Sequence, residues 1–347
     1  MIKINSDLCH DILIKNASLT LEFDKNKDFF SWRKELKEKF TELLGINRIR
    51  ENDCPLEVKI ESEEIVKKDQ FVDCDYKRIR FIMTTERNMQ VPCYLLIPIG
   101  DKKKYPLAIT LQGHNKGGMA NSVFYHKDEK GNDVFQRGAH GLQAINEGYA
   151  GLCIEMRGMG ELEPSTEPRM WGDMCKFTAF SAMALGRTLV GERVWDISKG
   201  IDAMKHFPEV DTSTILCTGG SGGGTATFYA SAFDERITLS VPVVAFCPYK
   251  DSILDVNHCI CNLIPNVCDY FEMKDIAGLI APRKLMIING EKDVAFPIEP
   301  AKRGFSEMQE IYDKIGAKDK VRMVITPMHH YWCNDIVWNS IREFSKE

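Results

Sequence analysis

A glycine-rich stretch constrains the fold of this chain more than any other feature. Residues 215–237 read ILCTGGSGGGTATFYASAFDERI, in which a short apolar run is followed by five glycines around one serine and then by a helix-like pattern. Glycine inside a helix or strand costs stability because it loses much conformational freedom on folding. The cluster therefore predicts a sharp turn at which a strand and a helix approach each other closely.

Apolar runs alternate with amphipathic segments on both sides of this turn. The runs within 106–118, 151–161, 213–220, 237–246, 282–293 and 320–330 are typical of strands buried on both faces. The segments 141–150, 193–207, 223–235, 300–316 and 332–344 have helical periodicity. Strands that alternate with helices predict an α/β fold with a mostly parallel central sheet and helices on both faces. Strands with alternating apolar and polar residues at 56–69, 76–86 and 90–99 predict an antiparallel edge.

The N-terminal residues form a further predicted unit. Residues 26–46 carry apolar side chains at helical spacing, and Gly45 is a plausible helix stop. We therefore expect an N-terminal helical extension over residues 1–50 and a catalytic domain over residues 51–347. A chain of 347 residues is long enough to bury one large core.

The glycine cluster contains the pattern G-x-S-x-G between a predicted strand and a predicted helix. In that context the serine of such a motif sits on a strained turn and acts as a nucleophile. The serine is Ser221. A phosphate-binding loop is the alternative interpretation, but no G-K-[ST] follows and no acidic residue lies at a convincing dinucleotide-binding spacing.

A serine nucleophile needs a base and an acid that orients the base. Asp293 follows a predicted buried strand, and Glu291 is its rival two residues earlier. The segment after the last predicted strand contains two histidines, of which we favour His330 as the base and keep His329 as the alternative. The order Ser, Asp, His along the chain is the order expected for a strand–turn–helix nucleophile of this kind.

Backbone N–H groups are expected to stabilise the oxyanion of the reaction. One comes from Gly222, directly after the nucleophile, and the others from His114 and Asn115 in the loop LQGHNKGGM after an earlier central strand. His114 precedes the serine in chain order, so we interpret its side chain as lining the pocket rather than as a base.

The order of these motifs resembles the α/β-hydrolase superfamily, and within it the group related to dienelactone hydrolase and acetyl xylan esterase. The resemblance spans residues 91–344 and implies an α/β-hydrolase fold with a Ser221–His330–Asp293 triad. Dienelactone hydrolases use cysteine as the nucleophile, so Ser221 indicates the esterase branch. Gln112 stands where histidine is usual in that group.

The resemblance also implies a substrate pocket and an activity. We place Arg157, Trp171 and Gly220 at the pocket, although aromatic and methionine side chains near Trp171 suit a core equally well. The implied function is a serine carboxylic-ester hydrolase that removes short acyl groups such as acetyl from a carbohydrate or small alcohol. The alternatives are a serine peptidase or amidase of the same fold and a hydrolase-like binding protein without catalysis.

Composition and cysteine content limit the binding partners and the cellular compartment that we expect for the protein. The net charge of −5 does not indicate nucleic acid or an anionic membrane as a partner. Of the 12 cysteines, those at 93, 153, 217 and 247 sit singly inside apolar runs, as small buried side chains in a reducing compartment would. The N-terminus also lacks the pattern of a signal peptide, so we expect a cytoplasmic protein that acts on a small-molecule ester.

A second cysteine-rich segment raises the question of a metal. His258, Cys259, Cys261 and Cys268 lie within eleven residues, and a zinc site needs about four such ligands in tetrahedral geometry. Their spacing is not that of a standard zinc knuckle. We therefore expect no metal and no organic cofactor, and interpret the segment as a loop and short helix packed over the active site.

Overall fold

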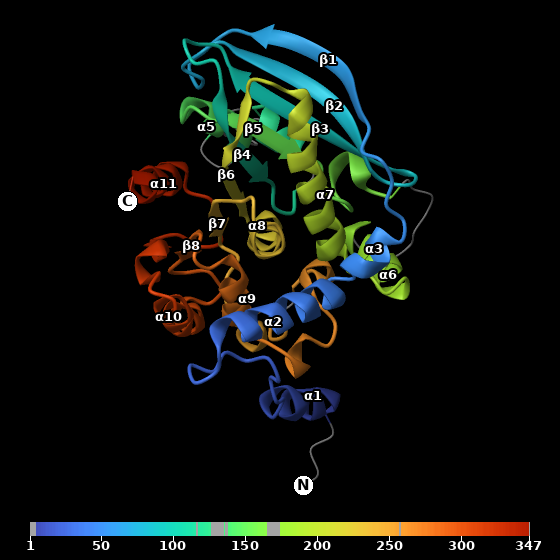
Figure 1. Cartoon of the computed structure of the whole chain (residues 1–347), viewed down its shortest axis with the longest axis vertical. Helices are drawn as coiled ribbons and strands as arrows, with labels where there is room; N and C mark the ends of the chain where they lie inside the picture. Colours follow the sequence, from blue (N-terminus) through green and yellow to red (C-terminus); the bar gives the residue numbers. More distant parts are fainter. Residues whose placement is uncertain are drawn as a thin grey trace.

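A mixed sheet forms the centre of the molecule. In the computed structural model, which describes residues 5–115, 117–125, 135, 138–164, 174–256 and 258–346, nine strands form one sheet in the order β1-β2-β3-β5-β4-β6-β7-β8-β9 (Figure 1). The strands are β1 (Val58–Val66), β2 (Tyr76–Glu86), β3 (Met89–Pro98), β4 (Tyr105–Leu111), β5 (Ala150–Ile154), β6 (Val210–Gly220), β7 (Leu239–Val243), β8 (Lys284–Gly290) and β9 (Val321–Thr326). Strands β1, β2, β3 and β5 pair antiparallel, and the pairings from β5 through β4 to β9 are parallel. The predicted parallel sheet with an antiparallel edge is confirmed.

Helices cover both faces of this sheet. The α-helices are α1 (Ser6–Lys15), α2 (Phe29–Leu43), α3 (Ile46–Arg50), α4 (Ala120–Val123), α5 (His140–Asn146), α6 (Met174–Ala184), α7 (Leu189–Ala203), α8 (Gly222–Phe233), α9 (Met273–Ile280), α10 (Ile298–Asp313) and α11 (Asn334–Lys346). The 3-10 helices are η1 (Gly160–Leu162), η2 (Met204–His206), η3 (Tyr249–Asp251), η4 (Ile260–Asn262), η5 (Val267–Asp269) and η6 (Lys318–Lys320).

Alternate residues of each central strand face different helices, which is why these strands read as continuous apolar runs. In β4, Leu107 and Ile109 belong to the main core together with α7, α8, α9 and α10. Ala108, between them, belongs to a second core cluster with α5 and α11 on the other face. A strand buried on both faces has no position for a polar side chain that faces water.

The N-terminal helix α2 packs into the main core, as its apolar spacing predicts. Its buried face consists of Phe29, Trp32, Leu36 and Phe40. The helix ends at Leu43, and Gly45 follows with a φ of 76°, a left-handed conformation that glycine adopts without strain. In Figure 1, α2 lies across α9 at the end of the molecule opposite β1. The division of the chain at residue 50 stays a proposal.

Within the described ranges, none of the helices combines the length and the apolar character that a bilayer crossing requires.

Candidate active site

The glycine-rich stretch forms the turn between β6 and α8. Ser221 stands alone between the last residue of β6 and the first residue of α8, with φ 56° and ψ −122°. This backbone conformation is strained for a residue with a side chain, and strain of this kind is characteristic of a nucleophile turn. The Ser221 N–H donates to the Val243 carbonyl over 2.9 Å, which ties the turn to the end of β7.

The flanking glycines permit the close approach that this turn requires. A Cβ atom on Gly219 would lie 2.6 Å from the Leu111 carbonyl oxygen, and one on Gly223 would lie 2.4 Å from the same oxygen. Both distances are shorter than real Cβ contacts, so β6, α8 and the end of β4 meet closely because these residues are glycines. The predicted strand–turn–helix context of Ser221 is present.

Asp293 and His330 form a hydrogen-bonded pair at the same edge of the sheet. Asp293 follows β8, His330 follows β9, and both strands run parallel to β6. The Asp293 Oδ2 and His330 Nδ1 atoms are 2.8 Å apart. Asp293 Oδ1 accepts hydrogen bonds from the N–H groups of Ala295 and Phe296, so this buried carboxylate is held in one orientation.

The rival residues point elsewhere. His329 is exposed, and its Nδ1 lies 3.2 Å from the Lys292 carbonyl oxygen. Glu291 is also exposed. The geometry therefore favours His330 and Asp293 as base and acid. In the described part of the chain the Ser221 hydroxyl is not hydrogen-bonded to His330, and such contacts often form only when substrate is bound. The complete triad stays a prediction.

The loop after β4 lies directly against Ser221. A Cβ atom on Gly113 would lie 2.8 Å from the Gly220 carbonyl oxygen and 3.2 Å from Ser221 Cβ. The Asn115 side chain folds this loop, because it donates to the Gly113 carbonyl and accepts from the Gly117 N–H. The loop therefore lies close to the nucleophile at Gly113, directly before His114 and Asn115. The roles of these two residues as oxyanion donors stay predictions.

Gly222 is the other predicted oxyanion donor, and it begins α8. Its N–H is one of the first N–H groups of the helix, which have no partner inside the helix. The imidazole of His114 packs over its Cα: a Cβ atom at Gly222 would lie 3.0 Å from Cε1 and Nδ1 of that ring. The two predicted sources of oxyanion donors are therefore neighbours in space.

The buried carboxyl group of Glu155 holds the same loop in place by hydrogen bonds. Glu155 accepts hydrogen bonds from the Gln112 side chain and from the N–H groups of Met119 and Glu161. Burial raises the pKa of the Glu155 carboxyl to about 7, and the hydrogen bonds from the backbone lower it in part. The buried Gln112 side chain thus helps to hold the loop.

The predicted pocket residues fall into three situations. Arg157 is buried, and its guanidinium pairs with Asp196 through two hydrogen bonds of 2.7 Å and with Glu86 over 2.7 Å. These contacts make Arg157 a brace between β2, α7 and the loop after β5. Gly220 is buried beside Ser221, with its Cα facing Trp332. Trp171 lies outside the described residues.

Another group of residues near the site was missed by sequence reasoning. His114, Cys175, Cys259 and Cys261 each offer a ligand atom, and these atoms all lie within 4.8 Å of one another. The set considered from the sequence is not the set that assembles. His258 contacts the Ala295 carbonyl and Ser252 instead, and Cys268 is not part of the group.

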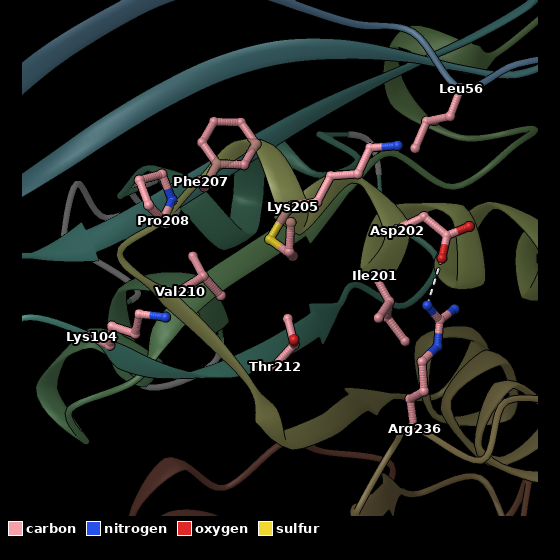
Figure 2. A pocket seen from close by; sticks show the side chains of 11 residues that line it. Leu56, Lys104, Ile201, Asp202, Lys205, Phe207, Pro208, Val210, Thr212 and Arg236 are labelled. Carbon is pink, nitrogen blue, oxygen red and sulfur yellow. Dashed lines mark hydrogen bonds and ion pairs between the residues drawn. The ribbon is translucent and has the colours of Figure 1, made fainter.

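A groove elsewhere on the surface is distinct from this site. Figure 2 shows it, lined by side chains that include Lys104, Asp202, Val210 and Arg236, with an ion pair between Asp202 and Arg236. Val210 begins β6 and Lys104 precedes β4, whereas Ser221 follows the carboxyl end of β6. In parallel sheets ligands bind at the carboxyl ends of the strands, so the groove is not our candidate.

The strand order and the turn at Ser221 define the class of the protein: it has the α/β-hydrolase fold. Comparisons with solved structures agree. A Bacteroides fragilis protein provisionally named an acetyl xylan esterase matches with a TM-score of 0.77 and 16% identity, over 99% of this chain and 95% of that one. A glucuronoyl esterase from Solibacter usitatus matches with a TM-score of 0.63 and 15% identity, over 95% of this chain and 97% of that one.

Sequence comparisons place the similarity around the nucleophile. The family model "Glucuronyl esterase, fungi" matches residues 187–245, a range that contains Ser221. YtaP of Bacillus subtilis, named as a hydrolase, is 24% identical over 262 residues, which are 74% of this chain and 83% of that protein. The resemblance to α/β-hydrolase esterases that the motifs indicate is confirmed.

Proposed function

We propose that the protein is a serine carboxylic-ester hydrolase. The observation that carries this proposal is the strained turn at Ser221, located at the same edge of the sheet as the hydrogen-bonded pair of Asp293 and His330. A nucleophile, a base and an orienting acid at the carboxyl ends of parallel strands are the components that acyl transfer by serine requires.

Each residue then has a defined task. Ser221 attacks the acyl carbon while His330 accepts its proton and later donates it to the leaving alcohol. Asp293 keeps the Nδ1 proton of His330 in place and stabilises the imidazolium ion. The N–H groups of Gly222, His114 and Asn115 stabilise the tetrahedral oxyanion, and each such donor typically contributes about 3 kcal/mol. Water then hydrolyses the acyl-enzyme, so the reaction needs neither a metal nor an organic cofactor.

The substrate that we propose is a short acyl ester, in the first place an acetyl ester, of a carbohydrate or small alcohol. The similarity to proteins named as acetyl xylan esterases supports this choice. A second candidate is an ester of a uronic acid, in which the sugar supplies the acyl group. The match of residues 187–245 to the glucuronyl esterase model and the fold shared with glucuronoyl esterases favour this candidate.

The test is hydrolysis of p-nitrophenyl esters of increasing acyl length by the wild type and by Ser221→Ala, together with acetylated xylo-oligosaccharides and a methyl glucuronate ester. We expect the fastest turnover on acetate and a loss of kcat of about 10⁴-fold or more in Ser221→Ala. Release of acetate from the sugars supports the first substrate, and cleavage of the glucuronate ester supports the second.

Two outcomes contradict the proposal. Turnover that survives Ser221→Ala excludes a serine mechanism. Absence of turnover on every ester, combined with activity on amides or with no labelling of Ser221 by a fluorophosphonate, favours the peptidase or the non-catalytic alternative. Circular dichroism of Ser221→Ala establishes that the variant is folded.

We further propose a cytoplasmic location. All 12 cysteines are free, and those at 93, 153, 217 and 247 are buried. Free thiols in this number suit a reducing compartment.

A further inference from the structure

Four metal-binding side chains from separate segments meet beside the predicted oxyanion loop. His114 follows β4, Cys175 lies in the first turn of α6, and Cys259 and Cys261 lie at the start of η4. One ligand atom of each residue is within 4.8 Å of all the others. His114 Nε2 and Cys261 Sγ are 3.2 Å apart.

These separations are close to those of a tetrahedral zinc site. Zinc bonds of about 2.0–2.3 Å to nitrogen and sulfur place the ligand atoms about 3.3–3.8 Å from one another. Shifts of about 1 Å or less bring the observed set to that geometry. Three cysteines with one histidine are a ligand combination of structural zinc sites, because soft thiolates and imidazole suit this ion.

A buried arginine supplies an independent reason for negative charge on these sulfurs. Arg193, on α7, is 1% exposed, and its guanidinium donates to Cys261 Sγ over 3.3 Å and to Cys175 Sγ over 3.0 Å. Its other hydrogen bonds go to the Arg157 carbonyl, and within the described ranges it forms no ion pair with a carboxylate. A buried cation is costly unless an anion compensates it. Neutral thiols do not provide that compensation, whereas thiolates do.

Metal binding balances the charge of the whole cluster. Three thiolates, one neutral imidazole and one Zn²⁺ carry a net charge of −1, and Arg193 carries +1. A disulfide between two of the cysteines would remove thiolate charge from Arg193 and leave the third cysteine and His114 without a role. N–H groups that donate to ligand sulfurs are also the usual outer support of metal–thiolate sites.

We propose that His114, Cys175, Cys259 and Cys261 bind one zinc ion, which revises our sequence-based expectation of no metal. Four protein ligands close the tetrahedron, so the ion holds structure and has no open position for water or substrate. It fastens the loop after β4 to α6 and to the segment around η4. The backbone of His114 and Asn115, our predicted oxyanion donors, is thereby fixed. The site stands independently of the esterase proposal.

The first test uses the wild-type chain, without a polyhistidine tag and purified without chelators. Elemental analysis should find about one zinc ion per chain. Replacement of zinc by Co²⁺ under reducing conditions should give the intense visible absorption of tetrahedral cobalt and a thiolate-to-cobalt charge-transfer band. Absence of both bound zinc and the cobalt spectrum would overturn the proposal, and this result does not depend on any variant.

The second test assigns the ligands. Cys259→Ser and Cys175→Ser should each weaken zinc binding by at least about 100-fold. Loss of a residue that only supports a ligand already weakens binding by up to about 100-fold, and loss of a ligand should cost more. Cys268→Ser, in the same segment but outside the cluster, should retain one zinc ion. Full zinc content in both ligand variants would contradict the assignment. Esterase turnover measured on the same samples separates this outcome from a failure of the proposed function.

Discussion

At the scale of single residues, two adjacent histidines have different surroundings, and this difference predicts different roles. His330 is hydrogen-bonded to the buried Asp293 and packs parallel to the Phe296 ring, with centroids 5.9 Å apart. His329 is exposed and reaches the Lys292 carbonyl. We expect His330→Ala to lower kcat by about 10⁴-fold or more, because loss of the base disables the nucleophile. His329→Ala should keep turnover near the wild-type value.

The comparison of kcat between these two variants checks the assignment, because both remove the same side chain and the two positions are adjacent. Asp293→Asn belongs in the same series and should lower kcat strongly without unfolding the protein, because it disturbs the tautomer of His330. A large loss in His329→Ala with little loss in His330→Ala would reverse our choice of base.

The sequence predicted the residues whose spacing follows the fold and missed those that only tertiary structure brings together. Ser221, Asp293 and His330 each follow a recognisable strand, and parallel strands place their carboxyl ends at one edge. The four residues for which we propose zinc binding are His114, Cys175, Cys259 and Cys261, and they come from three segments that are far apart in the chain. No spacing rule connects such residues, so the sequence grouped the neighbouring His258 and Cys268 instead.

At the scale of elements, the start of α9 holds two hydrogen-bonded carboxyl groups, the half-buried Glu272 and the buried Asp275. Glu272 caps the helix and accepts from the Tyr249 N–H, and Asp275 accepts from the N–H groups of Phe23 and Glu272. Burial raises the pKa of Glu272 to about 7 and that of Asp275 to about 7, from ordinary values of 4.5 and 3.8. Between about pH 4 and pH 7 the folded chain therefore keeps protons that the unfolded chain has released.

This difference makes the free energy of unfolding fall as the pH rises through that window. Asparagine does not titrate, so Asp275→Asn should make the free energy of unfolding less dependent on pH. We expect its decrease between about pH 4 and pH 7 to be smaller than in the wild type by about 1–3 kcal/mol. Denaturant unfolding at a series of pH values measures the slope. Asp255→Asn, at an exposed position, is the control and should leave the slope unchanged. An equal slope in Asp275→Asn and the wild type would contradict the assignment.

The elements themselves followed from the sequence where their periodicity was strong. The alternating pattern of 76–86 became β2, and the apolar spacing of the N-terminal helix became α2. The short helix α9 was not predicted as an element, because its eight residues give few turns of periodicity. Its beginning depends on Glu272 and Asp275, whose capping contacts include the distant Phe23 and Tyr249.

At the scale of the whole molecule, the N-terminal extension shares its core with the sheet domain. Trp32 of α2 is 4% exposed, and its Nε1 donates to the Leu21 carbonyl over 2.8 Å. A Cβ atom on Gly278 of α9 would lie 2.5 Å from its ring, so α2 and α9 are in close contact at this point. Ion pairs of Lys274 with Glu22 and Glu307 add to the same junction.

This packing predicts that the extension unfolds together with the sheet domain. Trp32→Ala should lower the free energy of unfolding of the whole chain by about 3–5 kcal/mol, because it leaves a cavity between α2 and α9. Phe30→Ala, two residues earlier and 72% exposed, should have little effect. Denaturant unfolding, followed by circular dichroism and by tryptophan fluorescence, measures both variants. A separate early transition, with the main transition unchanged in Trp32→Ala, would instead mean that residues 1–50 are an independent unit.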